Sequence, residues 1–441
     1  MIRQRPWLLP LLLAVMAAGG WYFGVRAQKS DRELPVYVTG GERLAKGEEI
    51  YRRVEGPNGE PADKKPFTYP PFSAVPFVPF AWLPATWQAP AWFCVNFVIL
   101  LLLGRWLHQW GRRDWAGAGP PRMGWYWGLL ALLGAHHVLS VLSNQSHDLF
   151  IAGAVGLCAA AWCRGGAMAG VWAGLGAAVK ATPLLFVGLF GLRLRWLALS
   201  WLLVTFVGLS LLPDWWFPRQ DGRWWLQAWY ELNLRQLEVG GTANAEGAWS
   251  THSYLNQSLS GTLTRLLTLA TNSEGSFIDA KVAVADLSPT TFLWLARTAQ
   301  LLVLCLMAIG IRGAARAMRG AADAATLQRT LGLGEVGAIV CGMVLLSPQS
   351  SKSHFCVWLF PAAFLADRVL RGRRDPLLLG LIGAAMLLAC TGAKDLVGTA
   401  VGNKLLAYGN VTWCTVLLLL ATVRSLCTAA VVPPASAAGP R

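Results

Sequence analysis

Repeated apolar runs dominate the sequence, and several approach the roughly 20 residues that a helix needs to cross a lipid bilayer. Of the 441 residues, 55% are hydrophobic and only 14% are charged. Only helices and closed barrels satisfy their backbone hydrogen bonds inside a bilayer, so runs of this length indicate membrane-spanning helices. We therefore predict an all-α, multi-pass membrane protein with about twelve spans, at residues 7–25, 88–107, 124–142, 148–163, 166–179, 182–193, 196–212, 290–311, 335–347, 355–370, 376–392 and 409–426.

The basic residues set the expected topology. The net charge is +15, yet the arginines lie in short loops between apolar runs, which argues against a nucleic-acid-binding surface. With Arg3 and Arg5 in the cytoplasm, the other arginine-rich loops alternate onto the same side. Both termini are then cytoplasmic, and the loops with polar motifs face outward. The nine cysteines show no paired spacing, so neither a disulfide framework nor a zinc site is predicted.

We predict one transmembrane domain over residues 1–430 and a disordered tail at 431–441. Two long outer loops interrupt the domain, the first at 26–87 and the second at 213–289. Within the first loop, the proline-rich segment 69–84 is expected to form an interfacial or re-entrant helix. If that segment crossed the membrane, the arginine-rich loop after the next span would lie outside.

Short motifs follow one another in a recognisable order, starting in the first outer loop. They are Glu33; Val36-Tyr37; a G-x-x-L-x-x-G motif from Gly41 to Gly47; Phe67-Thr68-Tyr69-Pro70-Pro71; Asn144-Gln145; AVKATP around Lys180; Asn256-Gln257-Ser258; and Ser347-Pro348-Gln349-Ser350 followed by His354. In this order they resemble glycosyltransferase family 87, the mannosyltransferase-like membrane enzymes of the C-type glycosyltransferase superfamily. The resemblance covers about residues 30 to 370 and implies a C-type helical bundle with interfacial helices in the first outer loop.

A carboxylate just after the first span is the candidate general base. The family usually has Asp four residues before the tyrosine of the V-Y pair; Glu33 holds that position here, with Asp31 two residues earlier. When a sugar leaves a lipid phosphate, the enzyme must supply an oriented hydroxyl, a base and cations for the departing phosphate. We predict Glu33 as this base, with Asp31 as second choice. The alternative is that both are solvated charges beside the membrane.

Four residues are predicted to bind the phosphate or sugar of a lipid-linked donor. Lys180 interrupts an apolar run, where an ionisable group is costly without a partner. It is either a phosphate ligand or a lysine that snorkels to the interface. The resemblance places His354 at the donor site, with helix capping as the alternative, and Tyr69 and Arg265 complete the predicted set.

The predicted acceptor or sugar contacts come from the first outer loop, from a polar turn between two apolar runs and from the second outer loop. They are Tyr37, Asn144, Gln145, Asn256 and Gln257. For the polar turn, an alternative is that Ser146 or Asp148 simply caps the next helix.

Together, these features predict a hexosyltransferase that moves a sugar, with mannose as first choice, from a polyprenyl phosphate to a glycolipid or cell-envelope glycan. The transfer would occur at the extracytoplasmic face of the cell membrane. The resemblance implies inversion at the anomeric carbon and no metal or other cofactor. Two alternatives remain: a transporter or flippase for a lipid-linked saccharide, and an inactive relative that scaffolds envelope assembly. Ionisable groups gather on one face, which favours an enzyme over a transporter.

Overall fold

The computed structural model describes residues 14–22, 32–53, 65–112, 120–236, 249, 252–269, 282–319, 321–371, 375–392 and 394–429. Every regular element in these ranges is a helix, which confirms the all-α prediction. Asp31 and the predicted tail at 431–441 lie outside the described residues. The helices are α2 (Leu34–Lys46), η2 (Pro71–Phe77), α3 (Val78–Ala81), α4 (Ala85–Arg112), α5 (Pro120–Asn144), α6 (Asp148–Trp162), α7 (Met168–Val179), η3 (Thr182–Leu185), α8 (Phe186–Leu192), α9 (Trp196–Trp216), α10 (Trp225–Trp229), η4 (Tyr230–Leu234), α11 (Leu259–Leu267), α12 (Pro289–Met318), α13 (Ala324–Leu346), η6 (Lys352–Trp358), α14 (Leu359–Leu370), α15 (Pro376–Thr391), α16 (Lys394–Val397), α17 (Thr399–Ala407) and α18 (Asn410–Thr428).

Within the described residues, seven helices are long and apolar enough to cross a membrane: α4, α5, α9, α12, α13, η6 with α14, and α18. Each overlaps a predicted span, although α13 begins 11 residues before the predicted 335–347. Four other predicted spans are shorter apolar helices, namely α6, α7, η3 with α8, and α15. The predicted run at 7–25 is described, as helix, over 14–22. The chain is therefore a multi-pass membrane protein, and the count of twelve spans stays a prediction.

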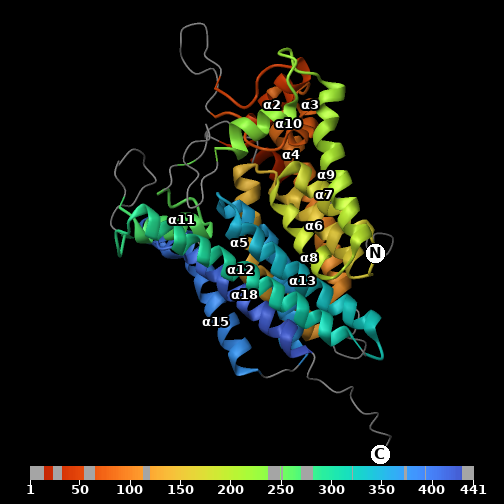
Figure 1. Cartoon of the computed structure of the whole chain (residues 1–441), viewed down its shortest axis with the longest axis vertical. Helices are drawn as coiled ribbons and strands as arrows, with labels where there is room; N and C mark the ends of the chain where they lie inside the picture. The colour runs from red at the N-terminus through yellow and green to blue at the C-terminus, as the bar shows by residue number, and fades with distance from the viewer. Residues whose placement is uncertain are drawn as a thin grey trace, which may run out of the picture.

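The helices form a bundle with a buried centre. In α13, 83% of the apolar stretch is buried inside the protein, whereas the share is 22% in α9 and in α12. Those outer helices expose leucine, valine and tryptophan side chains, as expected for surfaces that face lipid. Figure 1 shows an elongated body, with α2, α3 and α10 at one end of the long axis and α15 toward the other.

Two glycines allow α7 and α9 to pack closely. Gly170 and Gly174 lie one turn apart on α7, and both face the backbone of α9. A Cβ at Gly174 would lie 2.7 Å from the carbonyl oxygen of Leu202, and one at Gly170 would clash with that of Ala198. Small residues at this spacing let membrane helices approach until their backbones touch. The position of α7, whose last turn leads into Lys180, is therefore fixed by this contact.

The first outer loop folds into a layer of short helices over one end of the bundle. Gly41 of α2 lies so close to η2 that a Cβ would be 2.6 Å from the carbonyl carbon of Phe77. Helix α2 ends at Gly47, whose φ of 71° is the left-handed conformation that commonly terminates a helix. The segment Pro71–Ala81 is too short to cross a bilayer, as its prediction as an interfacial segment requires. This layer places Glu33, directly before α2, above the ends of the longer helices.

A closed polar network ties α6, the end of α8 and α13 together. Glu335 is fully buried and accepts hydrogen bonds from Arg193 Nη1 and Trp162 Nε1, both at 2.8 Å. Arg193 Nη2 donates to Gln328 Oε1 at 2.8 Å, and Gln328 Nε2 donates to the Trp162 carbonyl oxygen at 2.9 Å. The hydrogen bonds therefore form a closed ring that runs from Glu335 through Arg193, Gln328 and Trp162 back to Glu335.

Candidate active site

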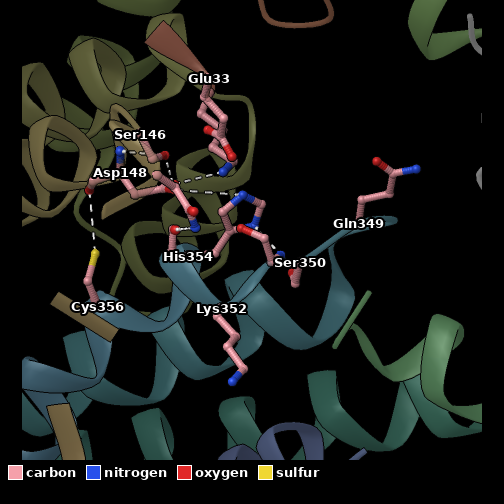
Figure 2. A network of polar contacts seen from close by, with 12 residues as sticks. Glu33, Ser146, Asp148, Gln349, Ser350, Lys352, His354 and Cys356 are labelled. Atoms are coloured by element: carbon pink, nitrogen blue, oxygen red, sulfur yellow. Dashed lines mark hydrogen bonds and ion pairs between the residues drawn. The ribbon is translucent and has the colours of Figure 1, made fainter. Parts of the chain in front are cut away.

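Asp148, the first residue of α6, lies at the centre of a second polar cluster (Figure 2). Its carboxylate accepts a hydrogen bond from Lys180 Nζ at 2.9 Å and another from the Ser146 hydroxyl at 2.6 Å. His354 Nε2 lies 3.8 Å from its Oδ2 atom. The side chains of Asp148 and Lys180 are only 4% and 11% exposed, so each charge depends on the other for compensation.

Lys180 enters the cluster because α7 ends there. Its backbone is extended, with φ −150° and ψ 123°. Pro183, three residues after Lys180, prevents α7 from continuing. The amine also lies 5.8 Å from the centre of the Tyr69 ring. A snorkelling lysine would place its amine in water, whereas this amine is buried against a carboxylate.

Glu33 is held from both its backbone and its side chain. Its backbone N–H donates to the carbonyl oxygen of Asn144 at 3.1 Å, which joins the first outer loop to the end of α5. The hydroxyl of Tyr37, one turn along α2, donates to the Glu33 carboxylate at 2.5 Å. Figure 2 shows the Glu33 side chain directed toward Asp148.

Burial raises the pKa of Glu33, and the negative charge of Asp148 raises it further, against the lowering effects of Tyr37 and Lys180. A raised pKa brings a carboxylate closer to the pH at which it can accept a proton efficiently. Burial also raises the pKa of Tyr37 and of Tyr69 well above the usual value for a phenol, so both stay protonated.

The polar turn between α5 and α6 is fixed by its backbone. Gln145 has a positive φ of 55°, and its carbonyl oxygen accepts a hydrogen bond from Trp92 Nε1 at 3.0 Å. The Asn144 side-chain amide donates to the hydroxyl of Ser353 at 3.2 Å. Asn144 and Gln145, predicted as acceptor or sugar contacts, therefore shape the turn that carries Asp148. For the helix-cap alternative, the Asp148 carboxylate faces Lys180 and does not cap α6, whereas the Ser146 hydroxyl accepts a hydrogen bond from the backbone N–H of Asp148 at 3.4 Å, at the start of α6.

His354 uses its two ring nitrogens differently. Its Nδ1 atom accepts a hydrogen bond from the backbone N–H of Ser351 at 3.2 Å, so Nε2 carries the proton that faces Asp148. The capping and site interpretations of His354 are thus compatible. Figure 2 shows the neighbouring Lys352 pointing away from the cluster, and its amine donates to the carbonyl oxygen of Gly392 at 2.7 Å.

A pocket of about 220 Å³ opens beside the cluster. Three of the predicted donor-binding residues line it: Tyr69, Lys180 and His354. A larger apolar pocket of about 630 Å³ adjoins it and shares Ala181 and Trp229 in its wall. The smaller pocket, here called the polar pocket, presents Lys180 and His354 within a largely apolar wall and lies beside an apolar groove along α9 and α10.

Arg265, the fourth predicted donor ligand, lies elsewhere. It is buried on α11, where its guanidinium donates to the carbonyl oxygens of Ser253, Asn256 and Ala407 and to the Thr262 hydroxyl. Nη2 also reaches the Leu406 carbonyl oxygen at 3.4 Å. All five N–H donors of the guanidinium therefore have acceptors within the protein, and the proposal below does not include Arg265.

Asn256 and Gln257 likewise bind the protein backbone. Asn256 donates to the carbonyl oxygen of Pro348 and accepts from the backbone N–H of Ser350. Gln257 donates to the carbonyl oxygens of Tyr254 and Leu406. The Asn256 bonds hold the segment that leads into His354, and neither side chain lines the pocket. Their predicted contact with the acceptor or sugar stays a prediction.

The sequence-based site missed Asp148 as a partner of Lys180. A signal was available, because these two ionisable residues sit at the ends of apolar runs that were predicted to meet at one membrane face. The fact that they pair with each other required the structure. Among the described residues, no group of three or more His, Cys, Asp or Glu side chains is arranged to hold a metal ion.

A long-helix bundle with a buried carboxylate–lysine–histidine cluster at one end defines a membrane protein with an enzyme-like polar site. A family model, glycosyltransferase family 87, matches residues 67–348, which is more than half of the chain. The chain therefore belongs to glycosyltransferase family 87, as the order of its motifs predicted. The matched range includes Tyr69, Asn144 and Lys180 and ends before His354, while Glu33 precedes it. Neither the curated proteins nor the solved structures contain a match.

Proposed function

We propose that this glycosyltransferase moves a hexose, with mannose as first choice, from a polyprenyl phosphate to a glycolipid or cell-envelope glycan. One observation carries the proposal. A carboxylate, Glu33, lies in the same buried cluster as Lys180 and His354, beside a pocket lined by Lys180 and His354. A base and two groups that can bind phosphate are the components that such a transfer requires.

In the proposed step, Glu33 accepts the proton of the acceptor hydroxyl as its oxygen attacks the anomeric carbon. The bond from that carbon to the phosphate oxygen breaks, and the lipid phosphate leaves with the bonding electrons. Lys180 and the Nε2–H of His354 stabilise the negative charge that develops on the phosphate. Attack from the side opposite the phosphate inverts the anomeric carbon. The residues of this chain thus supply the base and the donor-phosphate contacts.

The apolar pocket beside the polar one supports a lipid-linked donor rather than a water-soluble one. Leu184, Phe206 and Leu226 contribute to its wall, and it meets the polar pocket at Ala181 and Trp229. A ligand that places its phosphate at Lys180 can therefore lay a hydrocarbon chain in the adjoining groove, where its burial is favourable.

The extracytoplasmic orientation is part of the proposal. Arg193 and Arg195 lie between α8 and α9, Arg319 directly follows α12, and Arg329 lies in the second turn of α13. Arginine-rich loops favour the cytoplasmic side. A topology reporter fused at the α8–α9 connection is expected to be cytoplasmic, and one fused between α10 and α11 external; the reverse pattern would contradict the orientation.

The decisive experiment uses the purified full chain in lipid vesicles. Polyprenyl-phosphate mannose is supplied with a lipid extract of the cell envelope, and the glycolipids are analysed by mass spectrometry. A new glycolipid one hexose heavier supports the proposal. Movement of the donor across the bilayer without transfer would identify a flippase, and neither activity would support the scaffold alternative.

A further inference from the structure

His147, in the polar turn between α5 and α6, has a side chain that has not yet been given a role. It is only 1% exposed, and neither of its ring nitrogens has a hydrogen-bond partner among the described residues. His354, in the same cluster, uses Nδ1 to accept a backbone hydrogen bond. Buried polar atoms are paired in most proteins, so two unpaired atoms on one buried side chain call for an explanation.

The ring of His147 lies between the two functional halves of the proposed site. On one side its centre is 4.7 Å from that of Tyr37, whose hydroxyl binds Glu33. On the other side it is 4.4 Å from that of Tyr69, whose ring lies under the Lys180 amine. The next residue along the chain pairs with Lys180. His147 thus stands between the proposed base and the proposed phosphate ligands.

The chemistry of this ring suits a hydroxyl partner. Burial lowers the pKa of His147 to about 3, so the ring is neutral at physiological pH. A neutral imidazole has one N–H donor and one nitrogen acceptor. A sugar hydroxyl both donates and accepts hydrogen bonds, so it can pair with either nitrogen without adding a charge.

We propose that His147 binds a hydroxyl of the transferred sugar and so determines which hexose is accepted. This inference rests on the proposed function, because the sugar must lie between the phosphate at Lys180 and the acceptor at Glu33. Tyr69 lines the pocket and packs against His147, which does not line it, so the inference requires that the Tyr69 ring moves when the sugar binds.

The expected consequence is selectivity rather than a general gain in rate. A site that hydrogen-bonds a particular hydroxyl discriminates strongly against a sugar that lacks it or carries it in another orientation, because the buried protein group is then left unpaired. Removing the imidazole nitrogens should therefore lower the ratio of kcat/KM between the preferred sugar and the others. The loss in kcat/KM that all sugars share should be smaller.

The test compares three donors, polyprenyl-phosphate mannose, glucose and galactose, with the full-length protein in vesicles. In His147→Phe the aromatic ring is kept and both nitrogens are lost. The ratio of kcat/KM for the preferred donor to that for the next is expected to fall by roughly tenfold or more. His147→Gln, which restores a donor and an acceptor, should recover most of that ratio.

His108→Phe serves as the matched control, because His108 lies on α4 against Trp127, outside the cluster. A uniform loss across the three donors, or an unchanged ratio, in His147→Phe would overturn the inference and leave His147 a packing residue. If His147→Phe does not fold, His147→Ala takes its place and is held to the same ratio. A wild-type protein that transfers none of the three sugars would instead contradict the proposed function.

Discussion

The buried polar clusters around Glu335 and around Asp148 differ in how completely their groups are paired. In the cluster around Glu335, both carboxylate oxygens have donors, and the network closes through Arg193, Gln328 and Trp162. In the cluster around Asp148, Lys180 has one hydrogen-bond acceptor among the described residues, and both nitrogens of His147 lack partners. A pocket adjoins the second cluster.

The difference separates a structural use of buried charge from a functional one. A fully matched ion pair in an apolar interior holds helices together, and removing one partner leaves a charge that nothing compensates. A cluster with unused donors beside a pocket retains the capacity to bind a ligand. Both clusters are buried and charged, so these properties do not distinguish them. They differ in whether their hydrogen-bonding atoms already have partners within the protein.

The largest expected effect comes from Glu33→Gln. The substitution keeps the size of the side chain but removes the base, and loss of a general base typically costs about 10²–10⁴ in rate. Donor binding should persist, because the proposed phosphate contacts come from Lys180 and His354. Sugar transfer and donor binding are measured separately on the purified protein.

Glu42→Gln on the exposed face of α2 is the matched control, and it should leave transfer unchanged. Asp31→Asn should cost far less than Glu33→Gln. If Glu33→Gln transfers sugar at the wild-type rate and Asp31→Asn does not, the base is Asp31 rather than Glu33.

Arg193→Met tests the other cluster and should act on stability rather than activity. It leaves Glu335 buried without its cation, which for a buried pair costs about 3–5 kcal/mol. Thermal unfolding in detergent should show a clear loss of stability. The double variant Arg193→Met/Glu335→Leu should regain most of that stability, because no charge remains unpaired. The activity per folded molecule should be unchanged. An equal loss of stability in single and double variants would show that the ion pair is not the reason for the effect.

Lys180→Ala should raise the KM for the lipid donor by roughly 10–100-fold, the value of a hydrogen bond between charged groups. Part of that loss arises because Asp148, left without its partner, repels the incoming phosphate. Adding Asp148→Asn should therefore recover some donor affinity, and Lys180→Arg should retain more activity than Lys180→Ala. Normal transfer by Lys180→Ala at low donor concentration would show that Lys180 does not bind the donor.

The smallest expected effect is a shift in pH dependence. Because burial and Asp148 raise the pKa of Glu33, the acid limb of kcat/KM should lie above the ordinary pKa of a glutamate. Activity requires the deprotonated form, so it is lost as pH falls through that raised pKa. Asp148→Asn removes one raising charge and should move the limb to lower pH, whereas Asp323→Asn at the start of α13 should not. A limb that stays in place in Asp148→Asn would show that another group titrates.

Much of the fold could be predicted because apolar runs fix where helices form. The seven long helices overlap predicted spans, and the proline-rich stretch of the first outer loop forms short helices. The number of crossings could not be derived, because α7 and α8 are too short for length alone to show whether they span.

The site was harder to predict, because polarity does not say which way a side chain points. Tyr69, Lys180 and His354 line one pocket, and their predicted contact with the donor stays a prediction. Arg265 was predicted to bind the donor and Asn256 the acceptor or sugar, yet both bind backbone carbonyls. Their partners lie far along the chain, at Ala407 and Pro348, and a single sequence does not reveal such contacts.

The glycines of α7 have a consequence for where the chemistry takes place. With Gly170 and Gly174 seated against α9, α7 cannot slide along its neighbour without a collision of backbones. Lys180 follows the last turn of α7, so its height along the bundle is set by this contact. If Lys180 binds the donor phosphate as proposed, the depth of that phosphate in the membrane is set by the protein, and a bilayer of different thickness has to adjust to the enzyme.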